Sequence, residues 1–145
     1  DLIYALGDGP NGNDLLAFNA VDLKMKASFP LGGVSTWGPE TLGKWTYATQ
    51  ADGTLVAFGT GPMPEFEIKL PDGRAVGRPL QWKEKTIVTL RDGKIAVFDA
   101  NQPTDGAVII DSHQPLSGQS SISGNRLFVA STDGSIGVFD LSLVK

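Results

Sequence analysis

Four phenylalanines recur at nearly equal intervals along this chain of 145 residues, and each closes a similar short segment. They are Phe18, Phe58, Phe98 and Phe139, which lie 40, 40 and 41 residues apart. The segments that they close read NDLLAF, DGTLVAF, DGKIAVF and DGSIGVF. A repeat of this length is one supersecondary unit that cannot bury its faces alone, so the spacing predicts similar units packed against one another.

Each of the last three units contains a hairpin signal, an Asp-Gly pair between two short apolar runs. The pairs begin at Asp52, Asp92 and Asp133, and Asp-Gly favours the type I′ turn, in which both central residues have positive φ. Extended segments follow the hairpins at 23–29, 66–70 and 107–110, and less apolar ones precede the later hairpins at 33–42, 77–82 and 118–122. Four short strands in about 40 residues predict the blades of a β-propeller.

The sequence therefore predicts an all-β fold, a β-propeller segment of four blades that are four-stranded antiparallel sheets. The blades span approximately residues 1–32, 33–70, 77–110 and 116–145, within one domain, or part of one, that covers 1–145. The first and last blades are incomplete, and bare sheet edges are an aggregation hazard that natural chains cover. We therefore expect an arc of a larger propeller, completed by missing blades of the same propeller or by a second copy in a homodimer. The chain has neither an initiator Met nor a signal peptide, so we expect a processed product or a piece of a longer protein.

Composition excludes several functions. The net charge is −4 and the twelve basic residues are scattered, so we expect no nucleic-acid partner. No apolar run approaches the roughly 18 residues of a membrane-spanning helix, so we expect no membrane span. Cysteine is absent, which excludes disulfides and thiolate chemistry.

The segments 126–140 and 92–100 resemble the repeat of the pyrroloquinoline-quinone-like (PQQ-like) β-propellers. That repeat is a strand, an Asp-Gly turn and a second strand that ends in an aliphatic-Asp step. WD-type repeats are similar at the Phe-Asp step, but their Gly-His pair is missing here. The resemblance implies a propeller architecture and an extracytoplasmic (periplasmic or secreted) location, and it carries over no functional residue.

The quinone-dependent dehydrogenases of this superfamily use a docking tryptophan, a vicinal cysteine pair and a calcium site. The positions expected for the tryptophan carry Ala27, Glu67 and Ile110, and the chain has no cysteine. The chain is more similar to degenerate, non-enzymatic members such as outer-membrane assembly lipoproteins. We therefore expect a non-catalytic scaffold without a cofactor, which binds a protein or polysaccharide partner through loops and the channel mouth. The alternative is an arc of a quinone-dependent (PQQ) or sugar-oxidising propeller dehydrogenase whose active groups lie on other blades.

The segment Gly7-Asp8-Gly9-Pro10-Asn11-Gly12 matches the dinucleotide pattern G-x-G-x-x-G. A dinucleotide site would require a helix directly after it. Because residues 15–18 align with strands elsewhere, we instead expect a hairpin loop that is longer than the others. The same region holds four oxygen donors, which are weak candidates for metal binding or simply turn residues: Asp8, Asn11, Asn13 and Asp14.

Partner-binding candidates come from the predicted inner strands, which line the channel of a propeller. Trp37 has no aromatic equivalent in the other units, so it is either a core residue or a partner anchor. The polar candidates for the channel are Glu40, Arg78, Gln81, Gln119 and Ser120. His113 follows Asp111 and Ser112, and we expect a solvated loop histidine because the members of a catalytic triad come from different elements.

Overall fold

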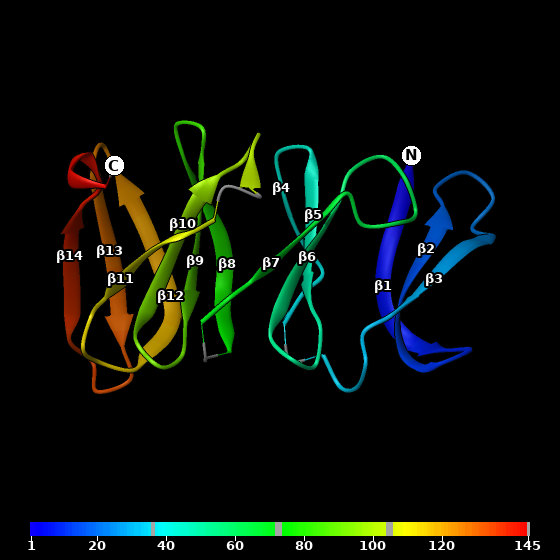
Figure 1. Ribbon diagram of the computed structural model, residues 1–145, viewed down its shortest axis with the longest axis horizontal. Coiled ribbons are helices and arrows are strands. Elements are labelled where there is room, and N and C mark those ends of the chain that lie inside the picture. Colours follow the sequence, from blue (N-terminus) through cyan, green and yellow to red (C-terminus); the bar gives the residue numbers. More distant parts are fainter. Residues whose placement is uncertain (36, 72–73, 104–105, 145) are drawn as a thin grey trace. The chain divides into compact units, whose positions relative to one another are not determined.

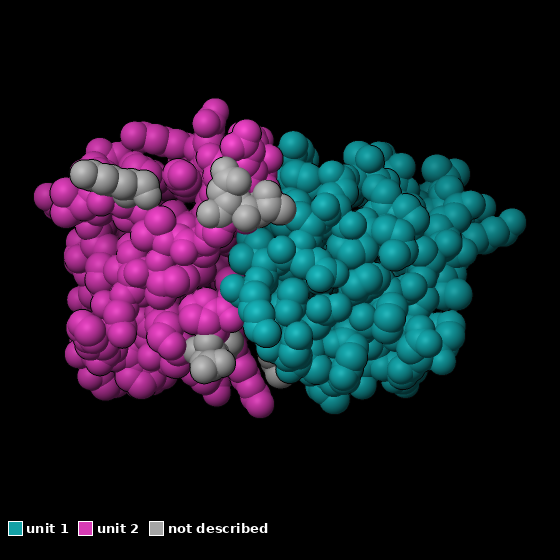
Figure 2. Space-filling view, viewed as in Figure 1, with its two compact units in different colours: residues 1–69 teal, residues 70–145 magenta. Residues whose placement is uncertain are grey.

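The computed structural model describes residues 1–35, 37–71, 74–103 and 106–144. The described residues form fourteen β-strands and one short 3-10 helix, η2 (Leu141–Leu143) (Figure 1). The chain divides into two compact units, Asp1–Lys69 and Leu70–Lys145, which Figure 2 draws in teal and magenta. Parts of the predicted segments 33–42 and 77–110, namely residue 36 and residues 104–105, lie outside the described residues. No helix among the described residues is long and apolar enough to cross a membrane.

The first unit contains two antiparallel sheets. One has the strand order β1-β2-β3, and the other has the order β4-β5-β6-β7. The strands are β1 (Leu2–Gly9), β2 (Gly12–Asn19), β3 (Met25–Pro30), β4 (Glu40–Leu42), β5 (Trp45–Thr49), β6 (Thr54–Phe58) and β7 (Phe66–Lys69). Phe58 lies at the centre of the core between the sheets, with the rings of Tyr4 and Phe29 each 5.4 Å away, centroid to centroid. Such tilted and edge-on ring pairs add to the stability gained from burial.

The second unit also contains two antiparallel sheets, with the orders β8-β9-β10-β11 and β12-β13-β14. The strands are β8 (Ala75–Trp82), β9 (Lys85–Leu90), β10 (Lys94–Asp99), β11 (Val108–Asp111), β12 (Leu116–Ser123), β13 (Arg126–Ser131) and β14 (Ile136–Asp140). Aliphatic side chains from both sheets form one core, which includes Ile95 and Val97 from β10 and Leu127 and Val129 from β13. The predicted set of antiparallel sheets, with the first and last incomplete, is confirmed in the described residues.

The Asp-Gly hairpins are confirmed, but the predicted turn type is wrong. Gly53, Gly93 and Gly134 have φ of 86°, 101° and 89°, whereas the aspartate before each of them does not have positive φ. The N–H of Gly53 donates to the carbonyl oxygen of Gln50, and the equivalent bonds recur at Gly93 and Gly134. Each connection is thus the common three-residue hairpin loop, in which a type I turn is followed by a glycine in the left-handed conformation.

Two further expectations are corrected. The Gly7–Gly12 segment is not a long loop, because β1 continues to Gly9 and β2 begins at Gly12; the extra residues lengthen the strands. No helix follows this segment, which removes the dinucleotide interpretation. The expected inner strand 33–42 is regular only over β4, since Gly38 has a φ of 98° and Pro39 offers no N–H to a ladder. The other inner strands, β8 and β12, are longer than predicted.

Candidate partner-binding surface

The inner strands β8 and β12 each contain a bulge at the same position of the repeat. The register of β8 on β9 shifts between Val76 and Leu80, and that of β12 on β13 shifts between Leu116 and Ser120. A glycine with positive φ lies inside each bulge, Gly77 at 69° and Gly118 at 89°. A bulge bends its strand and redirects the side chains beside it, and glycine is the residue that this backbone favours.

The backbones of the two bulges approach each other closely. A Cβ built on Gly118 would lie 2.6 Å from the backbone nitrogen of Gly77, and one built on Gly77 would overlap the carbonyl oxygen of Gly118. Any side chain here would force the two sheets apart. The glycines therefore hold β8 and β12 in close contact.

The bulges present two of the predicted polar residues. Arg78 and Gln119 directly follow the two glycines, lie 41 residues apart, and are both exposed. Ser120 is half-buried, and its hydroxyl has no hydrogen-bond partner among the described residues although water cannot reach it. Ser120 borders an open depression of about 260 Å³ lined by Gln119, Ser120, Ser121, Phe128, Val129, Ala130 and Ile136. The structure thus brings Arg78, Gln119 and Ser120 to neighbouring strands of one unit.

The remaining partner candidates differ in surroundings. Gln81 is exposed, and its side-chain amide donates a hydrogen bond to the carbonyl oxygen of Lys83 at 3.1 Å. Glu40 is half-buried at the start of β4. Trp37 is 7% exposed, and its carbonyl oxygen accepts a bond from the N–H of Thr49. So little exposed surface on Trp37 favours packing over contact with a partner.

The four weak metal candidates lie at the β1–β2 hairpin but not on one face of its sheet. Asp8 and Asn13 are opposite one another across the strands and are exposed. Asp14 is fully buried on the other face, since successive side chains alternate. Its Oδ2 accepts bonds from the Ser28 hydroxyl and from the backbone and side chain of Asn11, which are all hydrogen donors. These donors favour a structural carboxylate at this turn, and a metal role for the four residues stays a prediction.

Gly9 makes room for that carboxylate. A Cβ at Gly9 would lie 2.7 Å from Cγ of Asp14, which is too close for any side chain. The second glycine of the dinucleotide-like pattern is therefore required for packing. Among the described residues, no group of three or more His, Cys, Asp or Glu side chains could hold a metal ion.

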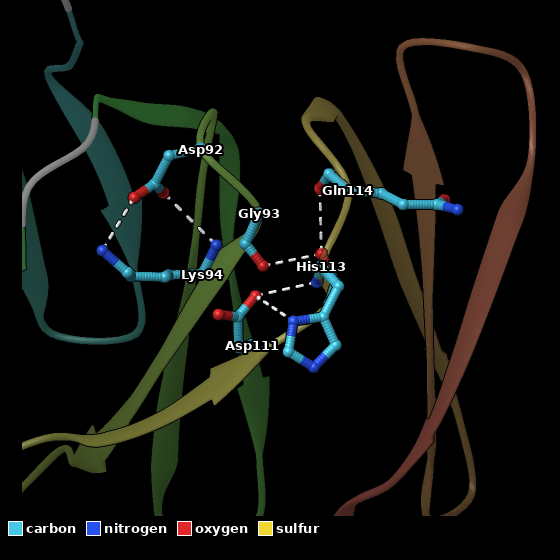
Figure 3. Close-up of polar contacts among 7 residues, drawn as sticks. Asp92, Gly93, Lys94, Asp111, His113 and Gln114 are labelled. Carbon is cyan, nitrogen blue, oxygen red and sulfur yellow. Dashed lines mark hydrogen bonds and ion pairs between the residues drawn. The ribbon is translucent and has the colours of Figure 1, made fainter.

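The loop around His113, which connects β11 to β12, is hydrogen-bonded to the β9–β10 turn (Figure 3). The Ser112 hydroxyl lies 2.6 Å from the carbonyl oxygen of Gly93 and 2.9 Å from that of Gln114. His113 is exposed, with Nδ1 3.4 Å from Oδ1 of Asp111. The serine hydroxyl thus has its one hydrogen directed at backbone carbonyl oxygens, which favours a structural role.

Sequence reasoning missed a polar hollow in the first unit. It has a volume of about 370 Å³ and is lined by Asp1, Leu2, Tyr4, Gly43, Lys44, Thr46, Gly59 and Thr60. The ammonium of Lys44 lies 4.6 Å from the ring centroid of Trp45, and burial together with the nearby Glu65 raises the pKa of Tyr4. A signal was available, because Gly43-Lys44 directly precedes β5 and Gly59-Thr60 directly follows β6, so these two turn sequences lie at the same end of adjacent antiparallel strands.

The turn aspartates have a shared electrostatic feature. The backbone N–H of Thr54 donates to Oδ1 of Asp52 at 2.9 Å, and that of Ser135 donates to Oδ1 of Asp133 at 2.9 Å. These bonds stabilise the ionised carboxylates, so they lower the pKa of Asp52 and of Asp133 below the ordinary 3.8.

Comparison with solved structures shows which fold these sheets form. BamB from Moraxella catarrhalis superposes with a TM-score of 0.67 at 19% identity, over 96% of this chain and 40% of BamB. BBS1N, in a complex with ARL6DN soaked with mercury, gives a TM-score of 0.70 at 15% identity, over 99% of this chain and 44% of that one. The computationally designed Ika4 protein gives a TM-score of 0.66 at 12% identity, over 97% of this chain and 85% of the Ika4 chain. Comparison of the sequence with protein-family models finds no match, and comparison with curated protein sequences finds none either.

The class follows from these likenesses. The chain is a β-propeller segment, as the four repeat units predicted. BamB is a PQQ-like β-propeller lipoprotein, the kind of protein that the repeat resembles. The chain spans less than half the length of BamB and of the BBS1N chain.

Proposed function

We propose that the chain is a non-catalytic β-propeller scaffold that binds a protein partner through the bulged inner strands. The four sheets are successive blades, over about residues 1–32, 33–70, 77–110 and 116–145. One observation carries the proposal: Arg78 and Gln119 are exposed at equivalent bulges that the Gly77–Gly118 contact holds side by side. Polar groups in fixed positions on a rigid sheet lose little entropy when a partner binds.

Two of the similar structures support this kind of function. The BBS1N structure contains that protein in a complex with ARL6DN, so a chain with this fold takes a protein partner there. The likeness to BamB, a lipoprotein, supports an extracytoplasmic location for this chain as well.

The proposal is tested by comparing what two charge-matched variants retain. The purified chain, an Arg78→Glu/Gln119→Ala variant and a Lys26→Glu control are immobilised and incubated with soluble cell extract. Lys26 is an exposed cation on β3 of the first unit, so the control makes the same change of charge elsewhere. Proteins retained by the wild type and by Lys26→Glu, but lost from the double variant, support the proposal. An identical set on all three contradicts it.

A polysaccharide partner is distinguished by affinity electrophoresis through gels that contain soluble polysaccharides. Retardation of the wild type and of Lys26→Glu, but not of the double variant, would identify the partner as a polysaccharide and would contradict the proposed protein partner. Equal mobility of all three leaves the protein as the proposed partner.

The non-catalytic part of the proposal has its own test. The chain is incubated with PQQ and calcium and then desalted. We expect no quinone absorbance in the protein fraction, because the cysteine pair and the docking tryptophan of the dehydrogenases have no counterpart in this sequence. Retained quinone absorbance would favour the arc of a quinone-dependent dehydrogenase instead.

A further inference from the structure

The two sheets of the second unit meet through unlike faces. The β8–β11 sheet uses the face that carries Ile87, Ile95 and Val97, which we call the forward face. The β12–β14 sheet meets it with the face that carries Leu127 and Val129, which we call the back face. Both sets of side chains are almost completely buried, so the forward face of one sheet fits the back face of the next.

The first unit repeats this rule. Tyr4 and Leu15 lie on the forward face of the β1–β3 sheet, at the repeat positions of Ile87 and Ile95. They pack with Val56 and Phe58 on the back face of the β4–β7 sheet. The same pairing of faces thus occurs independently in both units.

The β12–β14 sheet has a forward face with no sheet on it within its unit. The residues 41 positions after Ile87, Ile95 and Val97 are Phe128, Ile136 and Val138. Ile136 is 69% exposed and Val138 is 54% exposed, whereas their equivalents are buried. The open depression beside Ser120 lies on this face and includes Phe128 and Ile136 among its lining residues.

The β1–β3 sheet has a complementary back face. Leu16 and Phe18 stand 40 positions before Val56 and Phe58, and Ile3 stands opposite Phe18 in the ladder. Ile3 is 46% exposed, and Leu16 and Phe18 are partly exposed. Among the described residues, the β12–β14 sheet therefore carries an exposed apolar forward face, and the β1–β3 sheet carries an exposed apolar back face.

We propose that the forward face of the β12–β14 sheet docks on the back face of the β1–β3 sheet of a second copy of this chain. The contact continues the forward-to-back rule that both units already obey, with the same repeat positions on each side. Chain length agrees with this occupant, because the chain covers 43% of the Ika8 chain and 40% of BamB, so that two copies supply most of the length of either one. The contact joins two different surfaces, so it is heterologous and either closes into a ring or continues as a filament. It goes beyond the proposed function and does not depend on it.

The first test is the mass of the full chain in solution, by light scattering after gel filtration. We expect at least twice the monomer mass of 15.3 kDa. Ile136→Lys/Val138→Glu blocks the forward face and Ile3→Glu blocks the back face, and each variant should run as a monomer with an unchanged circular dichroism spectrum. Val21→Lys, at an apolar residue that is 92% exposed in the β2–β3 turn, is the control and should assemble like the wild type. A monomeric wild type overturns the proposal.

The second test distinguishes forward-to-back docking from docking of like faces. Each blocked variant keeps one intact face of the opposite kind, so an equimolar mixture of the two should form a dimer although each alone is monomeric. Self-association of Ile3→Glu through its intact forward face would overturn the proposal. A mixture that stays monomeric would overturn it as well.

Discussion

The two sheets of the second unit are copies of one repeat, yet they differ in what covers them. Ile95 in β10 is completely buried, whereas Ile136, its equivalent in β14, is 69% exposed. The strands have nearly the same sequence pattern, IAVFD in one and IGVFD in the other. The residue types are thus set by the repeat, while the energy that each contributes is set by whether another sheet lies on it.

The largest expected effect comes from truncating the same residue in both sheets. Ile95→Ala should destabilise the unit by about 2–5 kcal/mol, because it leaves a cavity in the core. Ile136→Ala should change the free energy of unfolding by less than about 0.5 kcal/mol, because its side chain is in water. Urea denaturation in the Ile3→Glu background, in which assembly is blocked, measures both. Equal losses would mean that the two sheets are covered alike.

A second prediction separates the cost of losing the close approach of Gly118 to Gly77 from the cost of placing a side chain on a backbone with positive φ. Gly118 and Gly134 have the same φ of 89°, but only the Cβ at Gly118 would meet the backbone of Gly77, since a Cβ at Gly134 meets nothing within 4 Å. Gly134→Ala should cost about 1–2 kcal/mol from the left-handed conformation alone. Gly118→Ala should cost about 1–3 kcal/mol more, as the strands must separate. The comparison is made by thermal unfolding, and equal costs would contradict the close contact of β8 with β12.

A third prediction concerns the hydrogen bond that joins the sheets at the edge of the same core. The indole N–H of Trp82 donates to the side-chain oxygen of Asn125 at 3.3 Å. Asn125→Ala should cost about 0.5–1.5 kcal/mol in denaturant unfolding. Gln81→Ala, which removes an exposed bond to a neighbouring turn, should cost less than about 0.5 kcal/mol and serves as the control. A neutral Asn125→Ala would show that the bond adds nothing to the packing of the sheets.

The smallest expected effect is on how the stability of the fold depends on pH in the acidic range. The pKa of Asp52 and of Asp133 is lowered in the folded state, mainly by hydrogen bonds from the backbone two residues further on. A lowered folded pKa stabilises the fold above the ordinary value of 3.8, and this stability is lost as the pH falls through the folded pKa. Asp133→Asn in the second unit should therefore flatten the fall of the melting temperature below that pH. If the melting temperature of Asp133→Asn depends on pH as that of the wild type does, the fall at low pH comes from other titratable groups.

The hairpins and the incomplete terminal sheets could be predicted because the repeat of Phe98 and Phe139 and the Asp-Gly pairs are local signals. The turn type could not, because an Asp-Gly pair suits several hairpin loops and the flanking ladder selects among them. The role of Gly9 was missed because its neighbour Asp14 faces it from the partner strand. The bulge at Gly118 had a signal in the sequence, since Gly77 stands at the same repeat position.

The most direct test of the account is a nuclear Overhauser measurement on the Ile3→Glu chain with labelled Ile, Leu and Val methyl groups. The central claim is that each unit stacks the forward face of one sheet on the back face of the next. It predicts cross-peaks from Ile95 and Val97 to Leu127 and Val129, and none from Ile136 to methyl groups of β8–β11. Cross-peaks from Ile136 to Ile95, with none from Leu127, would contradict it.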